Sequence, residues 1–199
     1  MSLASALQAF VAIFPAELPD KTMIATIVLV TRFRSPVLVW LGAAGAFAVH
    51  VTIAVTAGGL LGAAPDAMVR AVTTLLFLAG AVLLWRSAGR HLEPDPELEG
   101  ADQAAAAPTS PWPAIASSFG VVFVAEWGDL TQVATAGLAA RTGDPLGVAA
   151  GALAALWTVA GLAVTAGRSL ARRLPVSAMQ RVAACVFATL AIVTAVGGV

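Results

Sequence analysis

The chain of 199 residues is 59% hydrophobic and only 11% charged, and its formal net charge is zero at pH 7. With a mean hydropathy of +0.90, it carries more apolar surface than a soluble domain can bury, so the composition predicts a polytopic, all-α membrane protein. The zero net charge gives no reason to expect nucleic acid as a partner. A single cysteine, Cys185, excludes a disulfide framework and a multi-cysteine metal site.

Six apolar segments are each long enough to cross the hydrocarbon of a bilayer, which takes about 20 helical residues. They run over 6–30, 37–61, 69–88, 113–139, 146–167 and 176–198. Five acidic residues and several prolines lie between the third and fourth segments, which predicts a solvated linker. The predicted division is a three-helix unit in 1–90, an acidic linker in 91–112, and a second three-helix unit in 113–199.

The arginines predict an orientation in the membrane. Eight of the ten flank one side of the predicted spans, and only Arg70 and Arg141 flank the other. Because basic residues favour the cytoplasmic side, we expect both termini outside the cytoplasm and the acidic linker inside it, in a bacterial inner (plasma) membrane. The eight are Arg32, Arg34, Arg86, Arg90, Arg168, Arg172, Arg173 and Arg181.

Two short motifs place acidic residues inside apolar segments. In both, an Asp follows a Glu by three residues and a Thr follows the Asp by two. On a continuous helix, positions three apart share a face, so each motif is predicted to point two carboxylates the same way. An ionised side chain at mid-membrane costs about 2.5–3.5 kcal/mol even on the mildest scale, and a bound cation is the simplest compensation. The motifs are Glu17-Leu18-Pro19-Asp20-Lys21-Thr22 and Glu126-Trp127-Gly128-Asp129-Leu130-Thr131.

The two motifs belong to an internal repeat. Glu126 follows Glu17 by 109 residues, and Gly151 follows Gly42 by the same offset. Each copy of the repeat crosses the membrane three times. Because three is an odd number, the second copy must enter the membrane from the opposite side. The sequence therefore predicts two inverted three-helix repeats, an architecture that places substrate sites at the repeat interface near mid-membrane.

The candidate ligands are all oxygen donors, which favours a hard cation such as Ca²⁺, Mn²⁺ or Mg²⁺. Pro19 lacks an N–H and frees a carbonyl of the preceding turn, whereas Gly128 is expected to loosen its helix less. Another interpretation stays open, in which two kinked helices merely hydrogen-bond their carboxylates to neighbours. The predicted metal ligands are Glu17, Asp20, Thr22, Glu126, Asp129, Thr131 and Gln132.

Charge counting predicts competition between metal and protons. Four carboxylates facing one ammonium group, that of Lys21, cannot all stay ionised in a low-dielectric cavity, so the empty site should hold protons that an arriving divalent ion displaces. Leu130 takes the place of a basic residue in the second motif, so Glu126 is the predicted proton carrier. His50 lies alone in the second segment, where it acts either as a proton relay or as a hydrogen-bonded packing residue.

Paired Glu-x-Gly-Asp-(Lys/Arg)-(Ser/Thr) motifs in the first and fourth of six spans, around an acidic loop, resemble the Gdt family of manganese and calcium transporters. The resemblance covers essentially the whole chain and implies cation/proton exchange. Pro19 stands where the family has Gly, which bears on helix geometry, and Leu130 stands where a basic residue is usual, which bears on site charge. By resemblance, the ion-binding residues are Glu17, Asp20, Glu126 and Asp129, supported by Thr22 and Thr131.

The leading interpretation is a secondary transporter that exports Mn²⁺, with Ca²⁺ as a second candidate ion, from the cytoplasm in exchange for protons. The rival is a six-span exporter of small organic solutes such as basic amino acids, whose ammonium group the carboxylates would bind. We find no nucleophile–base pair, P-loop or Gly-rich nucleotide loop, so we expect neither an enzyme nor a cofactor. The expected partners are the divalent cation, protons and the lipid bilayer, and a homo-oligomer stays open.

Overall fold

The computed structural model describes residues 2–18, 21–88, 110–171 and 176–196. All regular secondary structure within these ranges is helical, as the composition predicts. The linker predicted at 91–112 lies largely outside the described residues, as do both ends of the chain. The helices are α1 (Leu3–Glu17), α2 (Lys21–Phe33), α3 (Pro36–Gly62), α4 (Asp66–Ser87), α6 (Trp112–Ala125), α7 (Leu130–Thr142), α8 (Pro145–Ala171) and α9 (Val176–Val196).

Four of the described helices are long and apolar enough to cross a membrane by themselves: α3, α4, α8 and α9. The segments predicted at 6–30 and 113–139 are not single helices, which corrects that part of the prediction. Each is divided into two shorter helices, α1 with α2 and α6 with α7. Hydropathy is summed over a window and does not register a break in the backbone, so it reported each pair as one span.

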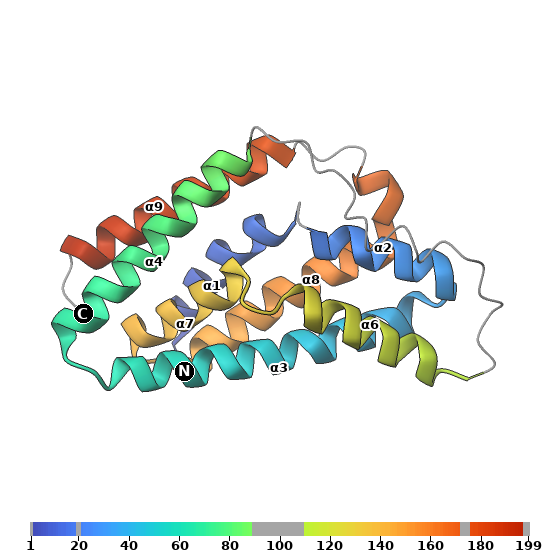
Figure 1. Ribbon diagram of the computed structural model, residues 1–199, viewed down its shortest axis with the longest axis horizontal. Coiled ribbons are helices and arrows are strands. Elements are labelled where there is room, and N and C mark those ends of the chain that lie inside the picture. Colours follow the sequence, from blue (N-terminus) through green and yellow to red (C-terminus); the bar gives the residue numbers. More distant parts are fainter. Residues whose placement is uncertain (1, 19–20, 89–109, 172–175, 197–199) are drawn as a thin grey trace.

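The two divided pairs lie along the two long central helices (Figure 1). α1 and α2 pack on α8, while α6 and α7 pack on α3, and α3 and α8 also pack on each other. α4 and α9 form a pair that packs against α1 and α7 at one end of the molecule. A long helix therefore lies behind each divided pair.

Helix boundaries recur along the chain at the spacing of the motifs. α2 and α7 begin and end 109 residues apart, and so do α3 and α8. The close contacts recur as well: a Cβ on Gly42 would lie 2.4 Å from the Ile115 carbonyl oxygen, and one on Gly151 would lie 2.0 Å from that of Ala6. Such contacts let helix backbones approach closely, which is how small residues hold membrane helices together.

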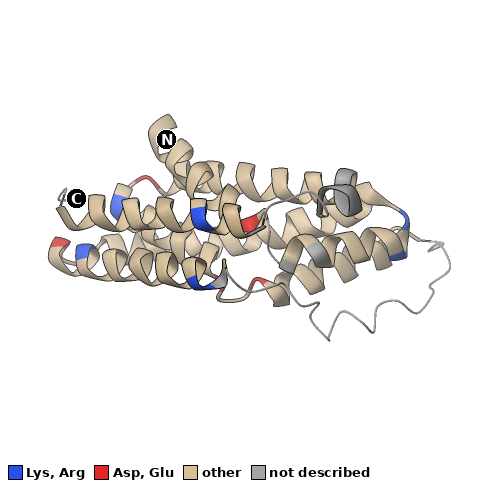
Figure 2. Ribbon diagram, turned by 90° about the horizontal axis from the view of Figure 1, so that it is seen from above, with Lys and Arg blue, Asp and Glu red and all other residues tan. Residues whose placement is uncertain are grey.

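The surface and the interior both suit a bilayer. Most of the described ribbon carries neither acidic nor basic residues (Figure 2). Large apolar side chains such as Leu60, Leu75 and Val182 are exposed, where lipid tails would contact them. Inside, three aromatic side chains are fully buried and anchor the core: Phe47, Phe77 and Phe187.

Candidate metal centre

The second motif occupies the break between α6 and α7. Glu126 is the C-cap of α6, and its N–H bonds to the Val122 carbonyl at 3.0 Å. Asp129 is the N-cap of α7, where its carboxylate accepts from the N–H of Thr131 at 3.3 Å. Gly128 lies between them with φ +73°, a left-handed conformation that a residue with a side chain seldom adopts. The helix is therefore interrupted here and not merely loosened.

This break corrects how the sequence placed the two carboxylates. They were predicted on one face of a continuous helix, but Glu126 and Asp129 lie at the facing ends of two helices. The last carbonyls of α6 and the first N–H groups of α7 are left without helical partners there. Discontinuous helices of this kind expose both carbonyl oxygens and carboxylates to a bound cation.

The first motif occupies the corresponding break between α1 and α2. α1 ends at Glu17, and the N–H of Leu18 bonds to the Phe14 carbonyl at 3.1 Å. The Glu17 side chain is 1% exposed. The predicted ligand Asp20 lies outside the described residues, and of Lys21 only its position at the start of α2 is described.

Three of the four predicted carboxylates converge. One oxygen from each of Glu17, Glu126 and Asp129 lies within 4.8 Å of the others. Oxygens bound to one Ca²⁺ ion are each about 2.3–2.6 Å from it and so at most about 5 Å from one another. The three carboxylates are thus spaced as ligands of a single hard cation would be, and they come from both motifs.

Two buried threonines complete this cluster. The hydroxyl of Thr22 donates a hydrogen bond to Glu126 Oε1, which joins the first motif to the second. The hydroxyl of Thr131 lies 3.5 Å from Asp129 Oδ2. Both predicted threonines therefore contact a predicted carboxylate, where each hydroxyl offers a further oxygen.

A second pair of buried threonines escaped the sequence analysis. Thr26 donates to the Thr22 carbonyl at 2.7 Å, and Thr135 donates to the Thr131 carbonyl at the same distance. Both lie one turn after the motif threonine, and they are 109 residues apart. That shared offset was a signal in the sequence that could have found them.

His50 and Gln132 hold the α6–α7 break in place. His50 Nε2 lies 2.9 Å from the carbonyl oxygen of Phe123, an acceptor that the break deprives of its usual helical donor. That ring nitrogen must therefore carry the proton, which leaves Nδ1 to accept from Gln132 Nε2 at 3.1 Å. The Gln132 amide oxygen in turn accepts from the N–H of Gly128 at 2.9 Å.

This chain of bonds bears on two sequence interpretations. The Gln132 oxygen, predicted as a metal ligand, is directed to the Gly128 N–H. His50 is 4% exposed and makes the hydrogen bonds of a packing residue. Its ring also lies against those of Phe123 and Trp127, with centroids 4.8 Å and 5.8 Å away.

The cavity that borders Glu126 is small. A cavity of about 10 Å³ borders Glu126, Thr131 and Gln132 on one side and apolar residues of α3 and α8 on the other. A volume of about 10–15 Å³ is the minimum that holds one water molecule. This cavity beside Glu126 therefore has room for about one ion or water.

Comparison with known proteins identifies the family of the chain. The family model described as divalent cation/proton antiporter GDT1 matches residues 5–91 and again residues 114–199. A GDT1-like protein of Synechocystis sp. is 33% identical over 90% of each chain. Protein PAM71, chloroplastic, of Arabidopsis thaliana is 33% identical over 94% of this chain and 55% of its own. GDT1-like protein 1, chloroplastic, of Oryza sativa subsp. indica is 32% identical over 94% of this chain and 60% of its own.

The chain thus spans nearly the whole of the cyanobacterial relative and somewhat more than half of the chloroplast ones. No solved structure matches it. The family of the model is one of transporters and not of enzymes, and the apolar helices place this chain in a membrane. This protein belongs to the GDT1 family of divalent cation/proton antiporters.

Proposed function

We propose that the protein exports Mn²⁺, and Ca²⁺ as a second ion, from the cytoplasm in exchange for protons. The observation that carries this proposal is the convergence of Glu17, Glu126 and Asp129 within 4.8 Å in the middle of an apolar bundle. Buried carboxylates at this spacing need a cation or protons to offset their charge. In an exchanger the carboxylates bind the cation and the protons in turn.

In this proposal the ion is held by oxygen atoms from both halves of the chain. The three converging carboxylates and the hydroxyls of Thr22 and Thr131 form the core of the site, and Asp20 joins them by its place in the first motif. Gln132 acts with His50 in positioning the α6–α7 break, because its amide oxygen is directed to the Gly128 N–H. An all-oxygen set suits Mn²⁺ and Ca²⁺ and does not favour Zn²⁺.

The rival function, export of small organic solutes, finds little space beside Glu126. A cavity of about 10 Å³ accepts one ion or water, whereas pockets for organic ligands measure about 300–1,000 Å³. The divalent cation of the family description needs no such space.

Several observations support two inverted repeats, residues 1–90 and 113–199, joined by a linker at 91–112. The family model matches each half separately, and helix boundaries recur 109 residues apart. The contact of α1 with α8 has its counterpart in that of α6 with α3. Six crossings follow if each divided pair, α1–α2 and α6–α7, together spans the bilayer.

The packing of α4 and α9 suggests how the ion reaches the site. α9 packs on α1 and α4 packs on α7, whereas the repeat-related pairs α4–α6 and α2–α9 make no comparable contact among the described residues. The α4–α9 pair therefore covers the α1/α7 side of the breaks and not the α2/α6 side. In the orientation that the arginines predict, the less covered side is cytoplasmic. We expect the opposite state to form when α4 and α9 move towards α2 and α6.

Flux into liposomes that carry the purified protein tests the function. A proton gradient across the liposome membrane should drive Mn²⁺ and Ca²⁺ in the direction opposite to the proton flow. Collapse of that gradient should stop net movement of both ions. Asp129→Asn should reduce both fluxes to the level of protein-free liposomes, while Asp66→Asn, at the exposed start of α4, should retain them. Wild-type flux in Asp129→Asn would show that the carboxylate site is wrongly assigned.

A further inference from the structure

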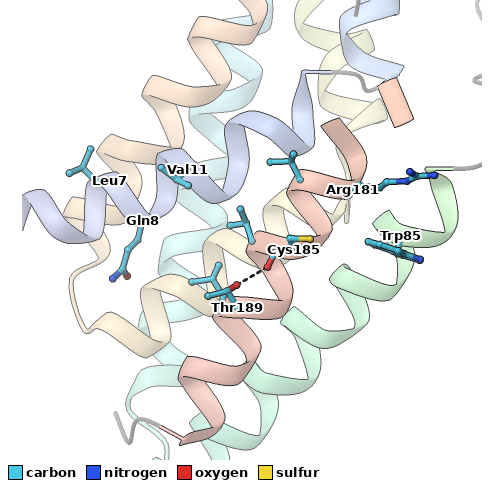
Figure 3. Close-up of a pocket in the computed structure, with 10 residues that line it drawn as sticks. Leu7, Gln8, Val11, Trp85, Arg181, Cys185 and Thr189 are labelled. Atoms are coloured by element: carbon cyan, nitrogen blue, oxygen red, sulfur yellow. Dashed lines mark hydrogen bonds between the residues drawn. The ribbon is translucent and has the colours of Figure 1, made fainter. Parts of the chain in front are cut away.

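A large groove lies on the outside of the bundle, away from the carboxylates. It has a volume of about 720 Å³ and runs between the first half of α1 and α9, with Trp85 of α4 at one end (Figure 3). Its walls are mostly apolar and include Leu7 and Val11 of α1 and Val182 of α9. These three side chains are 52–56% exposed, so in a bilayer the groove opens to the lipid tails.

Arg181, the charged residue among those that line the groove, lies at one end of it. Arg181 and Trp85 lie at the same end, as Figure 3 shows, and Gln8 lies towards the other. Arg86, in the last turn of α4, follows Trp85 directly in the chain. Tryptophan side chains collect at the membrane–water interface, so Trp85 marks the end of the groove where lipid headgroups lie. Exposed arginine is thus found at headgroup level, and apolar walls continue below it.

We propose that this groove binds one anionic phospholipid, with its phosphate at Arg181 and an acyl chain along the walls formed by α1 and α9. The planar guanidinium group pairs with phosphate oxygens through two parallel hydrogen bonds. A volume of about 720 Å³ lies in the range of pockets that enclose whole small molecules. A zwitterionic lipid fits the walls equally well, but its net charge of zero gains less from an arginine.

The position of the groove connects this lipid with transport. α1, which forms one wall, ends at Glu17 in the carboxylate cluster. α9, which forms the other wall, belongs to the α4–α9 pair. A lipid between them bridges α1 to α9 and so stabilises the arrangement in which these two helices pack together.

Lipid retention tests the proposal directly. Protein in detergent is mixed with equal amounts of phosphatidylglycerol and phosphatidylcholine, separated from free lipid, and weighed with its bound lipid by native mass spectrometry. The wild type should retain more phosphatidylglycerol than phosphatidylcholine. In Arg181→Gln the ratio of the two retained lipids should fall about fivefold. Arg32→Gln, which removes an exposed arginine of α2 outside the groove, should keep it. A wild type without preference, or an unchanged preference in Arg181→Gln, would overturn the proposal.

Cys185, the single cysteine, lines the groove and is exposed, so it reports on occupancy without any mutation. N-ethylmaleimide should modify it more slowly in vesicles with phosphatidylglycerol than in pure phosphatidylcholine, and the difference should vanish in Arg181→Gln. Thr189→Trp, which fills the groove but keeps the arginine, should abolish phosphatidylglycerol retention. Formation of a Cys185–Cys185 disulfide between two chains, independent of lipid, would show instead that a second copy covers this face and would refute the lipid site.

Discussion

The hydroxyl of Thr22 donates a hydrogen bond to Glu126 Oε1, across 104 residues of chain. The donor belongs to the first motif and the acceptor to the second, and both side chains are buried. Each half of the chain therefore completes the polar environment of the other half. A site built in this way depends on the relative position of the halves, which is what an alternating-access transporter changes.

Removal of the Thr22 hydroxyl should weaken ion binding without unfolding the protein. A hydrogen bond to a charged group contributes about 1.5–3 kcal/mol, so Thr22→Val should raise the Mn²⁺ concentration needed for half-maximal flux by about ten- to a hundredfold. Thr22→Ser should restore most of it. Thr31→Val is the matched control, because Thr31 lies on the same helix and its hydroxyl bonds to the Ile27 carbonyl of that helix. Equal effects in the two valine variants would contradict this role.

Proton coupling should depend more on Glu126 than on Glu17. Metal and protons compete for the same oxygens, so apparent Mn²⁺ affinity of the wild type should rise with pH across the range where the carboxylates lose their protons. Leu130 supplies no fixed cation near Glu126, whereas Lys21 follows Glu17 by one helical turn in the sequence. Glu126→Gln should therefore flatten the pH dependence more than Glu17→Gln does. Affinity measured against pH in all three proteins decides the matter: equal slopes in the variants would refute the assignment to Glu126, and a pH-independent wild type would refute coupling itself.

His50 and Gln132 should act as one unit in holding the α6–α7 break. Either His50→Ala or Gln132→Ala interrupts the hydrogen bonds from the Phe123 carbonyl to the Gly128 N–H. The double variant should lose little more Mn²⁺ affinity than either single variant. The effects of substitutions within one hydrogen-bond network are not additive. A double-mutant cycle on Mn²⁺ affinity measures this coupling. Strictly additive losses would mean that the two side chains act independently.

The tight glycine contacts predict opposite outcomes for two similar substitutions in α3. Gly42→Ala places a Cβ 2.4 Å from the Ile115 carbonyl oxygen, so α3 and α6 must separate, at a cost of about 1–3 kcal/mol. A Cβ on Gly59 meets nothing within 4 Å, and Gly59→Ala should stabilise the helix by about 0.5–1 kcal/mol. Thermal unfolding in detergent should rank the variants Gly59→Ala, wild type, Gly42→Ala. Gly151→Ala should behave like Gly42→Ala, because its Cβ would meet the Ala6 carbonyl oxygen at 2.0 Å.

Asp144, in the loop before α8, should make the stability of the folded protein depend on pH. The N–H of Gly147 and then that of Ser2 bond to its carboxylate and hold the pKa of Asp144 below its ordinary value of 3.8. A lowered pKa in the folded state adds stability that is present above the unfolded pKa and is lost as the pH falls through the folded one. Asp144→Asn should therefore unfold at a lower temperature than the wild type at pH 7, and the gap should close below about pH 4. A gap that is constant with pH would contradict a role for the charge.

Much of this protein is determined locally and can be predicted from the sequence. Long apolar runs specify membrane helices because each residue's preference for lipid is its own property. Four of the six predicted segments fall on single long helices, and the other two fall on divided pairs. The offset that links Glu17 to Glu126 is likewise written in the sequence, and three of the four carboxylates that it singles out meet in the structure.

Only the tertiary structure decided how those carboxylates meet. The sequence places Glu126 and Asp129 on one helical face, whereas the chain ends one helix and starts another between them. That break leaves backbone groups without their helical partners. His50 of α3 bonds to the Phe123 carbonyl and Gln132 of α7 bonds to the Gly128 N–H, which replaces part of the lost hydrogen bonding. The side chain of His50 lies 73 residues from its carbonyl partner. Whether a helix stops or continues at a glycine depends on such distant partners, and no local pattern records them.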